Sequence, residues 1–78
     1  TGKPVTIRIN LEGMSQNLPE ELKTILEKNP GDRQVIFQLE HPEGYLINLK
    51  PKDVIQVSAK EDLIQQLELL CGKGKVVL

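Results

Sequence analysis

Apolar and polar residues alternate along two neighbouring segments of the chain, residues 34–40 and 45–50. A period of two, with β-branched and aromatic side chains, is typical of a strand that buries one face. The connecting residues 42–44 are Pro-Glu-Gly. This triplet suits a three-residue hairpin loop, because proline presets the first turn position and glycine accepts a positive φ. The pattern therefore predicts a β-hairpin.

The register of this hairpin follows from the same residues. A three-residue loop places Leu39 opposite Ile47 and Phe37 opposite Leu49, and residues directly opposite each other share a face. A slip of one residue would place these apolar side chains opposite polar ones. The turn and the alternation thus predict the same pairing.

Three further segments have strand character. Residues 5–11 alternate in the same way and follow Pro4, which is tolerated at the start of a strand. Residues 54–57 are compatible with a short additional strand, and residues 75–78 with a short last one.

Two segments have the period of an amphipathic helix. The first covers about residues 18–28, with Asn17 as its N-cap and the stop signal Asn-Pro-Gly-Asp at residues 29–32. Its apolar stripe consists of Leu18, Leu22, Ile25 and Leu26.

The second helix is predicted to begin with a capping box at residues 58–61. There the Ser58 hydroxyl would accept a hydrogen bond from the N3 amide, while Glu61 reaches back to the cap. Gly72 is predicted to end this helix. Its buried stripe is formed by Leu63, Ile64, Leu67 and Leu70, with Leu69 and Cys71 near the edge.

The order of these elements predicts one α+β domain over residues 1–78. We expect a two-layer sandwich, with two helices on one face of a mostly antiparallel sheet, in the ferredoxin-like βαββαβ order or a variant of it. The additional strand at residues 54–57 would rearrange the sheet. The chain begins with Thr1 rather than methionine, which a C-terminal fragment of a larger protein would show, and equally a processed or trimmed chain.

Composition narrows the function classes. The net charge is −1 with both signs mixed along the chain, which disfavours nonspecific binding to duplex nucleic acid. No apolar run approaches the ~18 residues of a membrane span. A single cysteine, Cys71, excludes an internal disulfide and fits a reducing compartment, so we expect a cytoplasmic protein.

No residue pattern predicts catalysis, and we expect no metal and no cofactor. His41 is the only histidine and lies beside a turn. Cys71 stands at a helix C-terminus, which raises rather than lowers a thiol pKa. Residues 72–75, Gly-Lys-Gly-Lys, follow a helix, whereas phosphate loops precede one. The carboxylate pairs at residues 20–21 and 61–62 lie in first turns, where they complement the helix dipole.

One set of segments carries a family resemblance: residues 29–39 and 44–49, Val54, and residues 61–63 and 67–78. Together they resemble the extreme C-terminal domain of the bacterial DNA polymerase III alpha subunit. In that family a Pro-Gly-Asp…Val hairpin follows a leucine-rich helix, and a second helix ending in Leu-Leu-Gly and a short strand complete the protein.

The resemblance implies a noncatalytic domain of a DNA-directed DNA polymerase, which docks the polymerase to the tau subunit of the clamp loader during DNA replication. It implies contact with the rest of the polymerase chain. The balanced charge and the lack of a long apolar run add two further expectations, weak or no direct nucleic-acid binding and no membrane partner. The resemblance places the tau contact loosely, on the end of the second helix and the tail. The residues expected there are Leu70, Lys73, Lys75, Val77 and Leu78.

The tail has physical features that suit a contact. A short terminal strand is expected at a sheet edge, where unpaired backbone groups can accept a partner. Alternation would turn Val76 and Leu78 one way and Lys75 and Val77 the other, so that one set packs on the core while Val77 offers an apolar contact outside. The alternative is that this strand only closes the sheet. Lys73 and Lys75 would add positive charge at the rim, which speeds encounter with an acidic partner.

Two other classes stay open from the sequence. One is a regulatory domain of βαββαβ type that senses a small molecule such as an amino acid, although the glycine loop after the first strand is reduced to residues 12–14. Thermal-shift screening with amino acids would identify it. The other is a nucleic-acid binder, which salt-dependent affinity for single strands would identify.

Overall fold

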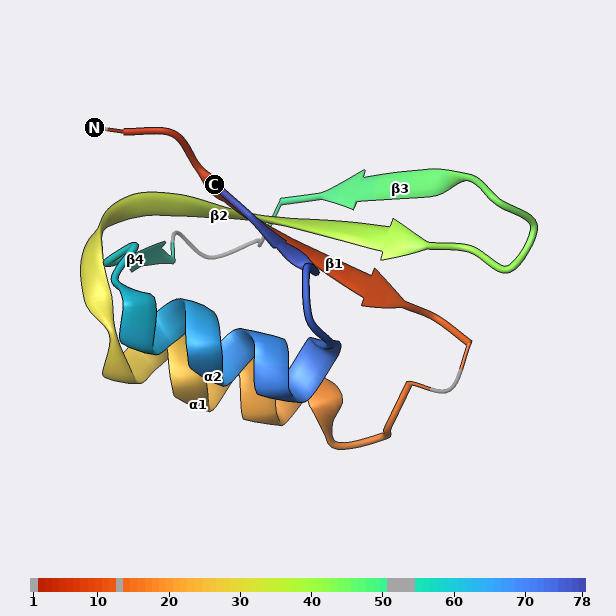
Figure 1. The fold of residues 1–78 in the computed structure, drawn as a ribbon, viewed down its shortest axis with the longest axis horizontal. Helices are drawn as coiled ribbons and strands as arrows, with labels where there is room; N and C mark the ends of the chain where they lie inside the picture. Colours follow the sequence, from red (N-terminus) through yellow and green to blue (C-terminus); the bar gives the residue numbers. More distant parts are fainter. Residues whose placement is uncertain (1, 13, 51–54) are drawn as a thin grey trace.

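The fold has two layers, a sheet of five strands and two helices on one of its faces (Figure 1). It is seen in a computed structural model that describes residues 2–12, 14–50 and 55–78. The elements in this part of the chain are β1 (Val5–Asn10), α1 (Leu18–Lys28), β2 (Pro30–Glu40), β3 (Leu46–Leu49), β4 (Gln56–Val57), α2 (Glu61–Cys71) and β5 (Val76–Val77). The predicted α+β sandwich is confirmed.

The strand order is β3-β2-β1-β5, with β4 paired to β2. β1 and β2 are neighbours and run parallel, from Val5 opposite Val35 to Asn10 opposite Glu40. The other three pairings are antiparallel. A split βαβ unit would place another strand between β1 and β2, so the order found here is a variant of the ferredoxin-like one. Helix α1 is a direct crossover between adjacent parallel strands.

The predicted hairpin register is confirmed. Phe37 lies opposite Leu49 and Leu39 opposite Ile47. The loop closes with a hydrogen bond of 2.9 Å from the His41 amide to the carbonyl oxygen of Tyr45. Its Gly44 has a φ of 98°, the conformation for which glycine was expected.

The core lies between the sheet and the helices. Alternation turns Val5, Ile7 and Ile9 of β1 towards the helices, and each helix contributes the buried leucines of its stripe. Full burial of one such side chain stabilises the fold by about 1.5–3 kcal/mol. The buried core residues are Val5, Ile7, Ile9, Leu18, Leu22, Leu26, Val35, Val57, Leu63 and Leu67.

The short additional strand is confirmed as β4. Its Val57 is fully buried and lies opposite Arg33 on β2, beside an irregular register that starts at Pro30. Val54, which belonged to the predicted segment, lies outside the described residues. Because β4 pairs with the first half of β2, it leaves the second half to β3.

The predicted capping box of the second helix is wrong. Helix α2 begins at Glu61, and its N-cap is Lys60, whose carbonyl oxygen accepts from the Ile64 amide. The Ser58 amide instead donates to the carbonyl oxygen of Asn29 at 2.9 Å. That bond holds Ser58 beside the start of β2, two residues before the N-cap. The Asn17 N-cap of α1 is confirmed in position, although its side chain makes no capping hydrogen bond.

Lys60→Ser should stabilise the protein by about 1 kcal/mol. Lys60 already has the extended backbone of an N-cap, with φ −87° and ψ 157°, but its side chain has no acceptor for the free amides. Its positive charge also opposes the dipole at this end of the helix. For a domain of this size the melting temperature should rise by roughly 4–8 °C.

Lys60→Ala is the matched control, because it removes the charge without adding an acceptor. An equal gain in melting temperature from both variants would attribute the effect to charge and contradict the capping argument.

Candidate partner-binding surface

The C-terminal end of the chain forms one continuous structure around the end of α2. The helix ends at Cys71, and Gly72 follows with a φ of 118°. The Glu68 carboxylate accepts a hydrogen bond of 2.8 Å from the Gly74 amide, which fixes the turn against the last helical turn. The chain then enters β5, which pairs antiparallel with β1.

Strand β5 lies at the edge of the sheet, as the sequence predicted. Val76 lies opposite Ile7 and packs against the core, whereas Val77 lies opposite Thr6 and is 41% exposed. Leu78 is 53% exposed. Two apolar side chains therefore reach solvent at this edge.

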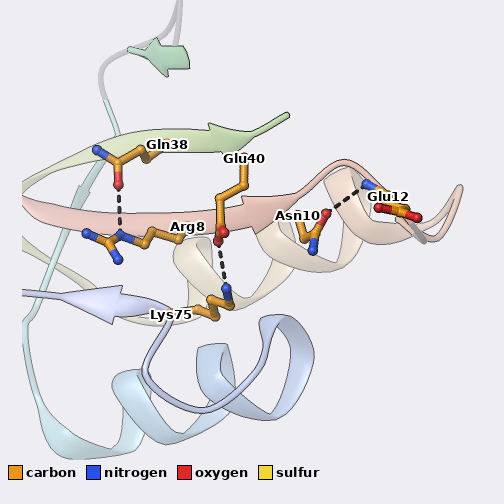
Figure 2. Close-up of polar contacts among 6 residues, drawn as sticks. All are labelled: Arg8, Asn10, Glu12, Gln38, Glu40 and Lys75. Atoms are coloured by element: carbon orange, nitrogen blue, oxygen red, sulfur yellow. Dashed lines mark hydrogen bonds and ion pairs between the residues drawn. The ribbon is translucent and has the colours of Figure 1, made fainter. Parts of the chain in front are cut away.

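Lys75 is held in an ion pair. Its Nζ lies 2.7 Å from Oε1 of Glu40, and both side chains are about two-thirds covered (Figure 2). Glu40 belongs to β2, so this ion pair reaches across β1 and ties β5 to the centre of the sheet. The rim charge expected from Lys75 is thus largely used within the domain, while Lys73 is exposed in the turn.

Leu70 lies in the last turn of α2 and packs against the core. It lines a hollow of about 240 Å³ together with Met14, Leu18 and Cys71. Burial raises the pKa of the Cys71 thiol, so it is less readily ionised than an exposed cysteine. Its partial burial agrees with the expected place of Cys71 near the edge of the buried stripe.

The five residues expected at the partner contact do not form one patch. Lys75 and Val77 share the sheet face that no helix covers, because they alternate with Val76, which faces the core. Leu70 belongs to the helix layer on the other side of the sheet. A partner that contacts all five must therefore wrap around the β5 edge.

The sheet face away from the helices carries a row of hydrogen-bonded polar side chains. Arg8 Nε donates to Oε1 of Gln38 at 2.8 Å, and Nε2 of Gln38 donates to Oδ1 of Asn48 at 3.1 Å (Figure 2 shows the first of these bonds). The row runs across three strands, from β1 to β3. These bonds satisfy hydrogen-bonding groups of the three side chains within the domain, so the centre of this face is polar. Val77 lies at one edge of the same face.

Sequence reasoning missed an apolar groove beside α1. It has a volume of about 440 Å³, and among the described residues that line it only Lys23 is charged. Its sheet side includes Phe37, Leu39 and Leu49, the apolar face of the predicted hairpin. They are not fully covered, because α2 packs against β1 and β5, and α1 against α2 and β4.

Leu69 was also misjudged. It was placed near the edge of the buried stripe, but it is 89% exposed. Residue 69 lies about 200° around a helix from the buried Leu67, so the helical period contained the signal.

The remaining candidates have structural roles. His41 stacks on Tyr45 with ring centroids 4.4 Å apart, and its Nδ1 accepts from the Glu43 amide at 3.1 Å. Residues 72–75 connect α2 to β5, as expected for a turn. In residues 2–12, 14–50 and 55–78 there is no cluster of three or more potential metal ligands, and no helix is long and apolar enough to cross a membrane.

Comparison of this chain with protein-family models, with curated proteins and with solved structures finds no significant match.

Proposed function

We propose that this chain is the C-terminal protein-interaction domain of a bacterial DNA polymerase III alpha subunit. In this proposal it is noncatalytic, works in the cytoplasm, packs beside the rest of the polymerase chain and docks it to the tau subunit of the clamp loader. The basis is the sequence resemblance, which covers the hairpin, the second helix and the tail.

One structural observation supports the placement of the contact. The tail is an edge strand whose Val77 and Leu78 reach solvent, 41% and 53% exposed. An edge of this kind offers unpaired backbone groups and apolar side chains to a partner segment. The exposed Lys73 beside it favours an acidic partner, mainly through the rate of encounter.

The amino-acid sensor has less support. The described residues that line the groove beside α1 present almost only hydrocarbon to it. The ammonium and carboxylate of an amino acid need polar partners when they leave water. A shift in melting temperature produced by one amino acid among twenty would nevertheless favour the sensor.

The test is binding of the tau subunit to the 78-residue chain by calorimetry. Val77→Asp combined with Lys73→Glu should weaken binding at least about tenfold, since it buries a charge and reverses another at the contact. The control is Leu46→Asp with Lys50→Glu, which makes the same change in net charge at the opposite edge, on and beside β3. The control should bind like the parent.

Circular dichroism and melting temperature must match among the three proteins. Unchanged binding by a folded Val77→Asp, Lys73→Glu variant would remove the tail from the contact. A parent chain that shows no heat of binding to tau would refute the docking proposal.

A further inference from the structure

Strand β3 is an exposed edge without the features that normally protect one. It is the last strand in the order on its side, and no described strand pairs with its outer edge. Its sequence, Leu-Ile-Asn-Leu, carries no charge and no proline, and its pairing with β2 has no bulge. Natural edge strands usually carry lysine, proline or a bulge that blocks further pairing. Leu46 and Leu49 are 51% and 47% exposed.

The direction of the free backbone groups on β3 follows from the hairpin. The His41 amide donates to the carbonyl oxygen of Tyr45, so Tyr45 directs its backbone towards β2. Backbone direction alternates along an antiparallel strand. Ile47 therefore also points towards β2, while Leu46 and Asn48 direct their N–H and C=O groups outward.

We propose that β3 pairs antiparallel with β3 of a second copy of this chain, around a two-fold axis at Ile47. In this register Leu46 of one copy and Asn48 of the other exchange backbone hydrogen bonds. Ile47 lies opposite Ile47, and Tyr45 opposite Leu49. These three side chains share the face of β3 that also bears the helices, because they lie opposite residues 37, 39 and 41. The strand is thus complementary to itself.

The charges that flank β3 select a second copy in this orientation. Glu43 precedes the strand and Lys50 follows it, and both are exposed. An antiparallel pair brings Glu43 of each copy close to Lys50 of the other, at both ends of the interface. A parallel pair would oppose like charges, which is unfavourable.

The pairing also completes the apolar groove. Leu49 lines the groove beside α1, and Tyr45 of the second copy lies opposite Leu49 in the proposed register. Each copy therefore adds an aromatic ring, half exposed in the single chain, to the edge of the groove in the other. This dimer uses the edge opposite β5, so it does not depend on the proposed function.

Sedimentation equilibrium of the 78-residue chain tests the pairing. The interface is small, so concentrations from micromolar to about 1 mM are needed. Leu46→Pro removes an outward N–H without touching a bond to β2, and should weaken dimerisation about tenfold or more. Leu46→Thr keeps the N–H and a strand-forming side chain, and should dimerise almost as well as the parent.

Both variants should keep the parent's circular dichroism spectrum. A parent that stays monomeric over the whole concentration range overturns the proposal, as does equal dimerisation of the proline and threonine variants.

Disulfide trapping tests the register, in chains that also carry Cys71→Ala. Ile47→Cys should form a disulfide dimer on mild oxidation. Tyr45→Cys and Leu49→Cys should each oxidise slowly alone, but form a mixed dimer rapidly when combined. The proposed pairs are not hydrogen-bonded to each other, and their Cα atoms should lie about 4.5 Å apart, within disulfide reach. Equal yields for the single and mixed samples would overturn the register.

Discussion

Leu67→Ala is expected to lower the free energy of unfolding by about 2–5 kcal/mol. Leu67 is fully buried in the centre of α2 and belongs to the core between helices and sheet. Alanine removes its contacts and leaves a cavity, because a packed interior relaxes only in part. Domains are stable by only about 5–15 kcal/mol, and one of this length lies near the lower end. The variant should therefore lose much of its stability in urea denaturation.

Leu69→Ala is the matched control, two residues further along the same helix. Leu69 is 89% exposed, so its truncation should change the free energy of unfolding by no more than about 0.5 kcal/mol. The two substitutions remove the same atoms and have the same helix propensity. Similar losses at both positions would mean that α2 is rotated about its axis relative to the sheet.

The hairpin was predictable because two independent local signals agree. Alternation identified the faces of the two strands, and the Pro-Glu-Gly loop fixed their register. Both signals act within a few residues, so no knowledge of the rest of the fold was needed. The same reasoning gave α1 and the end of α2 at Gly72.

The start of α2 was not predictable in this way, because a tertiary contact overrides a local motif. Ser58 and Glu61 have the spacing of a capping box, yet the Ser58 amide bonds to Asn29, distant in sequence. Val57, just before it, is fully buried in the β4 pairing with β2. The hydrogen bond from Ser58 to Asn29 extends this pairing by one residue, so the helix begins only at Glu61, three residues after Ser58.

The candidate contact surface was only partly predictable for a related reason. The edge position of β5 and the outward side chain of Val77 follow from chain order and alternation. The partner of Lys75 does not, because Glu40 is 35 residues away and reaches it only through the strand order β2-β1-β5. The groove beside α1 depends on how far the helices extend over the sheet, which no local pattern encodes.

Gly31→Ala is expected to destabilise the protein by about 1–3 kcal/mol and to detach β4. The φ of Gly31 is not positive, so it is not required for its backbone conformation. Glycine is required there because the backbone of β4 leaves no space for a Cβ atom. A Cβ there would lie 2.5 Å from both Cα of Ser58 and the carbonyl carbon of Val57, and would also contact the Ser58 amide nitrogen. These are backbone atoms that cannot rotate away, so β2 and β4 must separate.

Hydrogen exchange followed by NMR gives the decisive measurement. In Gly31→Ala the Ser58 amide, which donates to Asn29, should lose its protection, while amides in the β1–β2 ladder keep most of theirs. Gly74→Ala is the control, because its φ of 79° strains alanine but no atom lies within 4 Å of the added Cβ. Gly74→Ala should lower the global stability of the protein. The hydrogen-exchange protection of the Ser58 amide should then fall no more than the protection of the amides in the sheet. Unchanged Ser58 protection in Gly31→Ala would show that β4 does not cross β2 at this glycine.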